Sequence, residues 1–337
     1  MKTTILYIMS FLFYQTMFAT SFIKQSYWYN ISDNNAIQFA DKIVEQKSYL
    51  EIICDIAMLD TIYIEAYKEN KKIFQKQINN WSEEEATNIS INENIHSYFF
   101  EVEPLDSPPN KLIFKGTNDE ILKIINCNYI NLEGKVHCDF EHSKLYLSIF
   151  PNGFKDPDLV IQTNSDGFFS VILPLRRYNA LCALADTYAT HTLESWLYNF
   201  DGKNNTHINF NVTNAEIYNL HAWENNGGGN SLFVAFRPMT LKETSKYDIN
   251  IANDIFSKID FQLSLEKDNF KVYIEDEEIN IISIQPFYET TAENYALKSY
   301  LLQIDYEKKY RNKLLTIEFK QNTIHAISHC YLNFSPF

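Results

Sequence analysis

A chain of 337 residues is too long for one small core, so two or three domains are expected. Hydrophobic residues make up 45% of it, and only 8 Gly and 9 Pro occur, which argues against a disordered chain. The net charge of −14 repels nucleic-acid phosphates, so no nucleic-acid partner is expected.

The N-terminus has the features of a secretory signal peptide over residues 1–21. Lys2 gives a short positive region, Ile5 to Ala19 is apolar, and small residues at Ala19 and Ser21 supply a peptidase site. A transmembrane anchor is the alternative, but about 15 apolar residues fall short of the roughly 20 that span a bilayer. We therefore expect export to the periplasm, the cell surface or the extracellular space, with no integral membrane span after signal removal.

Residues 22–126 show the pattern of an N-terminal β-sandwich. Residues 61–67 alternate between apolar and polar side chains, as a half-buried strand does. The abundance of aromatic residues, with 25 Phe and 22 Tyr, also favours strands. The polar, acidic segment 82–94 is expected to be a solvated loop.

Residues 127–213 form a second predicted sandwich. Leu159 to Thr163 and residues 168–174 are apolar runs on either side of Asn164-Ser165-Asp166-Gly167. Glycine adopts positive φ without steric cost, so Asp166-Gly167 predicts a tight turn between two strands. Beyond the turn, Phe168, Ser170 and Ile172 should face opposite to Phe169, Val171 and Leu173.

This second segment resembles the carboxypeptidase regulatory-like, transthyretin-type β-sandwich domain. The resemblance rests on Gly134-Lys135-Val136 in an early strand and on Asp166-Gly167-Phe168-Phe169 before a strand that ends at Pro174, and it covers about 85 residues. In that family the domain is accessory and has no catalytic residues, so the resemblance implies none here. The segment 192–200 is longer and more aromatic than the last strands of that family.

Residues 214–337 predict a third sandwich, and both flanking units look immunoglobulin-like. Residues 216–223 and 231–236 flank a Gly/Asn-rich turn, which predicts a hairpin, and short apolar runs follow from residue 261 onward. Residues 240–256 are polar with weak helical spacing and are expected to form a crossover with a helical turn. The predicted fold class is thus all-β, with three consecutive sandwiches after a signal peptide.

Five cysteines in an exported chain permit at most two disulfides. Cys127 and Cys138 flank the first strand of the second unit and are the candidate pair. The alternative is that all five are buried hydrophobic residues.

Motifs for catalysis or metal binding are weak. His137, Cys138, Asp139 and His142 have metal-ligand side chains, but in a strand and turn these point to alternate faces. His325 and His329 would lie roughly 13 Å apart on one strand face, too far to share an ion. The sequence contains no G-x-S-x-G and no phosphate-binding glycine loop. We therefore expect no metal, no cofactor and no enzymatic activity.

Binding is the remaining class of function. His221, Trp223, Asn225 and Asn226, at the predicted hairpin turn, form a candidate ligand-binding group. Trp28, Trp81 and Trp196 are further candidates for stacking on sugars, although large aromatic side chains are more often buried in a core.

The sequence thus predicts an exported, non-catalytic protein that binds another envelope or extracellular protein, or organises a cell-surface assembly. The alternatives are a secreted carbohydrate-binding protein, whose partner is a glycan, and a hydrolase with a site between domains. Exposed coplanar aromatic residues on one sheet face would favour the first alternative, and a cleft with convergent carboxylates or histidines the second.

Overall fold

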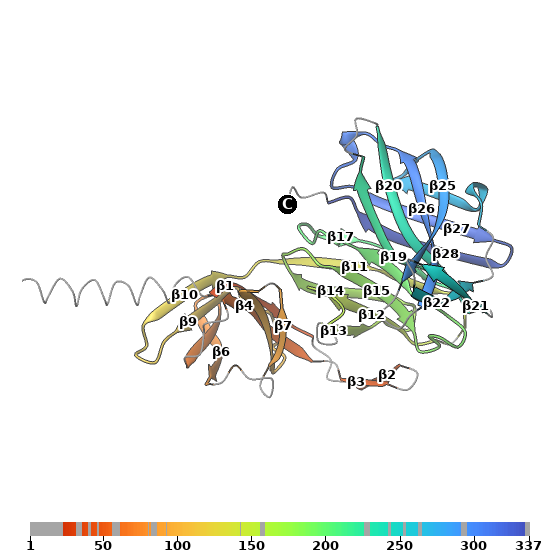
Figure 1. The fold of residues 1–337 in the computed structure, drawn as a ribbon. Coiled ribbons are helices and arrows are strands. Elements are labelled where there is room, and N and C mark those ends of the chain that lie inside the picture. The colour runs from red at the N-terminus through yellow and green to blue at the C-terminus, as the bar shows by residue number, and fades with distance from the viewer. Residues whose placement is uncertain are drawn as a thin grey trace, which may run out of the picture.

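The computed structural model describes residues 23–31, 36–39, 42–45, 47–55, 61–79, 81, 86–91, 93–141, 143–155, 159–225, 230–241, 244–251, 254–261, 265–290 and 295–333. The expected signal peptide lies outside these residues. Within them the chain is built from strands, with two short 3₁₀ turns, η1 (Lys267–Asn269) and η2 (Lys308–Tyr310). The predicted all-β class is confirmed (Figure 1). No helix in the described part of the chain is long and apolar enough to cross a membrane.

The N-terminal unit is a sandwich of two four-stranded sheets. Aromatic and aliphatic side chains from both sheets fill its core, among them Trp28, Phe100 and Phe114. A separate hairpin of β2 (Ala36–Phe39) and β3 (Lys42–Glu45) stands apart from both sheets. In spatial order the first sheet contains β1 (Ile23–Tyr29), β4 (Ser48–Asp55), β8 (Ile95–Val102) and β7 (Thr87–Ser90). The second sheet contains β10 (Ile121–Asn126), β9 (Lys111–Lys115), β5 (Ile62–Lys68) and β6 (Lys71–Ile78).

The middle unit packs a small sheet on part of a large one. The small sheet has β11 at its centre, paired with β14 on one side and with the short β17 and β18 on the other. Its inward side chains meet those of the large sheet in one core, among them Leu132, Phe169, Leu181 and Phe210. The small sheet contains β14 (Phe168–Pro174), β11 (Tyr129–Cys138), β17 (Thr206–His207) and β18 (Phe210–Val212).

The large sheet has eight strands and runs through both the middle and the C-terminal units. Its two halves join where β16 pairs in parallel with β28, with Leu197 opposite His329 and Tyr198 opposite Cys330. In spatial order it contains β13 (Leu159–Gln162), β12 (Leu145–Phe150), β15 (Ala180–Ala185), β16 (Ser195–Tyr198), β28 (Ile324–Tyr331), β27 (Leu314–Gln321), β23 (Phe270–Ile274) and β24 (Glu277–Glu278).

A six-stranded sheet completes the C-terminal sandwich. Its core with the large sheet includes side chains of both units, for example Cys182 and Trp196 from the middle unit and Leu232 and Leu302 from the C-terminal unit. The expected boundary at residue 214 lies between β18 and β19, while the large sheet continues past it. The six strands are β19 (Ala215–Glu224), β20 (Ser231–Thr240), β26 (Tyr295–Asp305), β22 (Asp254–Phe261), β21 (Thr244–Ile251) and β25 (Ile281–Thr290), the last paired with β26.

The turn expected at Asp166-Gly167 is present. Gly167 has φ of +83°, and a Cβ there would lie 2.3 Å from the carbonyl oxygen of Val136. Only glycine satisfies both the positive φ and this close approach. Along β14 the even-numbered Phe168, Ser170 and Ile172 are exposed and the odd-numbered residues are buried, as the alternation predicts.

The expected Cys127–Cys138 disulfide is wrong. Both thiols are free; Cys138 is the last residue of β11, and Cys127 lies two residues before its first. A ten-residue strand holds its ends roughly 30 Å apart, whereas a disulfide needs Cα atoms within about 7 Å. All five cysteines are free in the described structure, and three of them, Cys54, Cys182 and Cys330, are buried.

Two segments expected to be irregular contain strands. Segment 82–94, expected to be a loop, contains the edge strand β7, whose four side chains are all at least partly exposed. Segment 240–256, expected to contain a helical turn, instead lies in the hairpin of β21 and β22, which pair from Thr244–Phe261 to Ile251–Asp254. The side chains of β7 bury no face, so hydrophobic periodicity does not indicate this strand in the sequence.

Candidate functional site

The N-terminal unit joins the middle unit through a buried ion pair. Glu51 of β4 is 0% exposed, and its Oε2 lies 2.5 Å from Nη1 of Arg176, which follows β14. Ser97 Oγ donates to Glu51 Oε1 at 2.6 Å, and Tyr29 OH donates to Oε2 at 2.7 Å. Asn152 completes the group: its Nδ2 donates to Glu51 Oε1 at 2.9 Å, and its Oδ1 accepts from Arg176 Nη2 at 2.7 Å. We call these five residues the junction cluster.

In the junction cluster the buried charges of Glu51 and Arg176 stabilise each other. Burial by itself lowers the pKa of Arg176, but neighbouring Tyr29 and Glu51 outweigh burial and raise it above the ordinary value. Burial raises the pKa of Tyr29 well above its usual range, so this phenol stays protonated and can donate. The guanidinium also lies over the ring of Tyr27, 4.4 Å from its centroid. A buried pair of this kind is stable because hydrogen bonds satisfy its remaining polar atoms.

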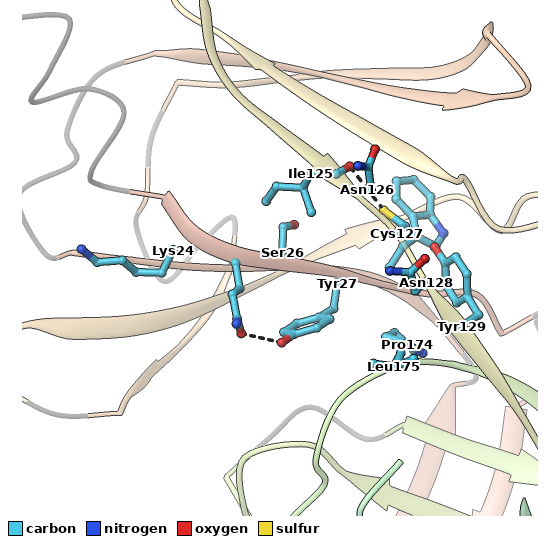
Figure 2. Close-up of a pocket in the computed structure, with 12 residues that line it drawn as sticks. Lys24, Ser26, Tyr27, Ile125, Asn126, Cys127, Asn128, Tyr129, Pro174 and Leu175 are labelled. Atoms are coloured by element: carbon cyan, nitrogen blue, oxygen red, sulfur yellow. Dashed lines mark hydrogen bonds between the residues drawn. The ribbon is translucent and has the colours of Figure 1, made fainter. Parts of the chain in front are cut away.

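A cavity of about 250 Å³ lies beside this junction, between β1 and β10 (Figure 2). One wall is formed by β1 from Lys24 to Trp28, and the other by residues 125–129, where β10 passes into β11. Pro174 and Leu175 lie between the two walls at the middle unit. Among the twelve lining residues Lys24 is the one charged side chain, although the protein as a whole is strongly acidic.

Both walls are edge strands. β1 ends one sheet of the N-terminal sandwich and β10 ends the other, so among the described strands each has a neighbour on one side only. On β10 the side chains of Ile121 and Ile124 are 56% and 51% exposed, which places them among the most exposed apolar side chains of the described structure. An edge strand with exposed apolar residues is a surface on which another polypeptide can pair.

The predicted ligand-binding residues lie elsewhere, on the C-terminal sandwich. His221 and Trp223 are both exposed on β19, two residues apart and therefore on one face. His221 hydrogen-bonds Asn219 Oδ1 at 2.8 Å, and Trp223, 44% exposed, packs on Phe233 with ring centroids 5.9 Å apart. Asn225 Nδ2 donates to Ser231 Oγ at 3.2 Å. Asn226 lies outside the described residues.

The other three tryptophans are buried in sandwich cores. Trp28 and Trp81 belong to the N-terminal core, and Trp196 lies in the core shared by the middle and C-terminal units. Trp223 is thus the one exposed tryptophan, and no exposed coplanar pair of tryptophans occurs in the described structure.

A buried and a partly buried carboxyl group, those of Glu216 and Glu194, meet where β16 approaches β19. The backbone N–H of Glu194 donates to Oε2 of Glu216 at 3.0 Å, and Glu216 is 2% exposed. Burial raises the pKa of both carboxyls, and in Glu194 the charge of Glu216 raises it further. The pair therefore retains a proton in a range where a solvated glutamate is fully ionised. No group of three or more potential metal ligands occurs among the described residues.

Sequence reasoning did not single out the junction cluster or this acid pair. Glu51 did carry a signal, because it is the one charged residue in the apolar run Leu50–Cys54. A charge in a buried strand requires a partner. Its partner Arg176 is 125 positions away, and nothing in the local pattern identifies it.

Comparisons with known proteins show only distant likenesses. No family model matches the chain, and no curated protein matches it. A marsupial T cell receptor matches 91% of this chain and 98% of its own, with 9% identity and a TM-score of 0.17. The major pilin subunit of Bacillus cereus, BcpA, matches 60% and 68% respectively, with 11% identity and a TM-score of 0.19. Tandem immunoglobulin domains of titin match 91% and 97%, with 8% identity and a TM-score of 0.17. Similarities at this level support no inference about function.

Proposed function

We propose that this protein is an exported, non-catalytic protein of β-sandwich units that binds another envelope or extracellular protein, or organises a cell-surface assembly. The middle unit, in this proposal, is an accessory sandwich of the transthyretin type. Export rests on the sequence of residues 1–21.

The observation that carries the proposal is the cavity between two edge strands at a fixed junction. The walls offer strand edges that pair with no other described strand and a lining without a carboxylate, and β10 also carries the exposed Ile121 and Ile124 outside that lining. The junction cluster fixes the middle unit against β4, the strand next to β1, so Pro174 and Leu175 keep their position in the lining. A preorganised surface of this kind lowers the entropic cost of binding a partner.

The absence of catalysis is part of the proposal and is supported by the surroundings of the acid pair. Glu216 is almost completely covered, and the rings of Trp196 and Tyr218 pack over this region with centroids 5.7 Å apart. A general acid must reach the proton that it transfers within hydrogen-bonding distance. The enclosure of Glu216 supports a structural role for this residue.

The test is capture of a partner from the envelope and medium of the producing cell, with the protein that begins at Phe22 as bait. We expect a stoichiometric protein partner, and we expect Ile121→Glu/Ile124→Glu to lose it. Ile172→Glu is the matched control, because Ile172 is 47% exposed on β14 of the middle unit.

Capture that is equal for the edge variant and the control would place the partner elsewhere on the surface. Recovery of polysaccharide without protein would overturn the proposal in favour of sugar binding.

A further inference from the structure

Four neighbouring strands of the large sheet place an asparagine at the same end. Asn152 follows β12, Asn179 precedes β15, Asn199 follows β16 and Asn333 follows β28. These strands are adjacent in the order β12-β15-β16-β28. The first two pairs are antiparallel and the third is parallel, so all four asparagines come to one edge. We call these four residues the asparagine row.

The backbone holds this row in register. The N–H of Asn179 donates to the carbonyl of Phe150 at 2.9 Å, and the N–H of Asn199 donates to the carbonyl of Asn179 at 2.8 Å. Asn333 Nδ2 donates to the carbonyl of Asn199 at 2.9 Å. Because neighbouring strands lie about 4.8 Å apart, the row extends over roughly 14 Å.

A second cavity, of about 260 Å³, lies along the row. All four asparagines line it, together with Pro151, Arg177 and Tyr178. Asn333 Oδ1 is buried there without a hydrogen-bond partner among the described residues. The side-chain amide of Asn179 makes no hydrogen bond to a described residue, but unlike Asn333 Oδ1 it belongs to a partly exposed residue. An orphaned buried acceptor in a polar cavity indicates a missing donor.

We propose that this cavity is a binding site for a neutral oligosaccharide. An amide side chain both donates and accepts hydrogen bonds, as a sugar hydroxyl does. Asn152 is already held by Glu51 and Arg176, and Nδ2 of Asn199 and of Asn333 donates within the protein, so the amide of Asn179 and the side-chain oxygens of Asn199 and Asn333 remain for hydroxyl groups. These three residues span roughly 10 Å, the length of about two sugar rings. Tyr178 is buried, so recognition here uses hydrogen bonds and no stacking on an aromatic face.

The charges of the cavity separate this ligand from an anion. Arg177 is the one cationic side chain in the lining, and its Nε lies 3.4 Å from Oδ1 of Asp201. An anionic ligand would have to compete with that carboxylate. The lining residues include no acid, and the one cation in the lining is paired with Asp201.

The test is a glycan array with neutral and acidic oligosaccharides, probed with the full chain from Phe22 onward. The neutral oligosaccharide that binds best is then titrated against the variants. We expect Asn179→Ala and Asn333→Ala each to weaken binding roughly tenfold, as loss of one or two hydrogen bonds to a ligand does. Asn118→Ala is the control, because Asn118 is exposed in the N-terminal unit, away from the row. Thermal melting establishes that each variant is folded.

Three results would overturn the inference. One is that no neutral glycan binds the folded protein. Another is that neutral glycans bind equally to the row variants and to Asn118→Ala. The third is that only acidic glycans bind, with loss in Arg177→Gln. The site is separate from the edge of β10, so the Ile121→Glu/Ile124→Glu protein should retain glycan binding whatever its effect on a protein partner.

Discussion

Glu194 and Glu216 lie side by side at the contact between β16 and β19, where the middle unit meets the C-terminal sandwich. Burial raises the pKa of Glu216 and outweighs the hydrogen bonds from Glu194 and Trp196 and the charge of Arg237, which lower it. Arg237 is itself bound to Glu289 at 2.8 Å. In Glu194 both burial and the charge of Glu216 raise the pKa. The native state consequently holds more protons than the unfolded chain above the ordinary carboxyl pKa.

Raised carboxyl pKa values make stability depend on pH in a defined direction. The contribution is fully present below the unfolded pKa of about 4.5 and is lost as the pH rises through the higher native values. We expect the protein to be roughly 2 to 4 kcal/mol less stable at about pH 9 than at about pH 5 through this pair. Denaturant unfolding at the two pH values measures the difference, and Glu216→Gln should remove most of it. A pH dependence unchanged in Glu216→Gln would show that the pair does not share a proton.

The central element of the middle unit is β11, which is paired on both sides. β14 runs antiparallel to it, and the short β17 and β18 run parallel on the other side. Gly134 lies where the segment between β17 and β18 runs closely alongside β11. The N–H of Ile208 donates to the carbonyl of Glu133 at 2.9 Å, and a Cβ on Gly134 would lie 1.7 Å from the carbonyl oxygen of Ile208. A side chain at this position would therefore push the two segments apart.

Gly134→Ala tests this close approach of the two segments. We expect it to destabilise the middle unit by about 3 kcal/mol, because backbone atoms must move to accommodate the methyl group. Gly116→Ala is the control, since a Cβ there meets only the flexible side chain of Glu120. Thermal unfolding measures both. Equal melting temperatures for the two variants would contradict the close approach of the two segments.

At the scale of the whole molecule, two different kinds of contact hold the units together. The middle and C-terminal units share one sheet through β16 and β28 and share one core, so their contact is as continuous as a domain interior. Deleting residues 214–337 would therefore remove β28, β27, β23 and β24 from the large sheet and uncover the edge of β16. The N-terminal unit is joined by the junction cluster and by Tyr29 and Phe99, which pack into the middle core.

The junction cluster is tested by Arg176→Leu. This change leaves the carboxylate of Glu51 buried without its cation, and we expect a loss of roughly 3 to 5 kcal/mol. The double variant Glu51→Gln/Arg176→Leu should recover part of the loss, because the uncompensated charge is gone. Small-angle scattering should show a wider range of orientations of the N-terminal unit in the single variant. Unchanged melting and scattering would show that the cluster does not fix the junction.

The sequence by itself determined the strand-based fold class and the alternation along β14. It also determined the turn at Gly167. These features depend on side-chain periodicity and on backbone conformation, which neighbouring residues specify. The exposed face of His221 and Trp223 also agrees with a strand of period two.

Only the tertiary structure decided which distant residues meet. Glu51 and Arg176 are 125 positions apart, and Asn152 and Asn333 come to one edge only because β12 and β28 belong to one sheet. Cys127 and Cys138 are close in sequence, but the extended strand β11 between them holds them apart. Strand order and register depend on contacts across the whole chain, and local pattern does not encode them.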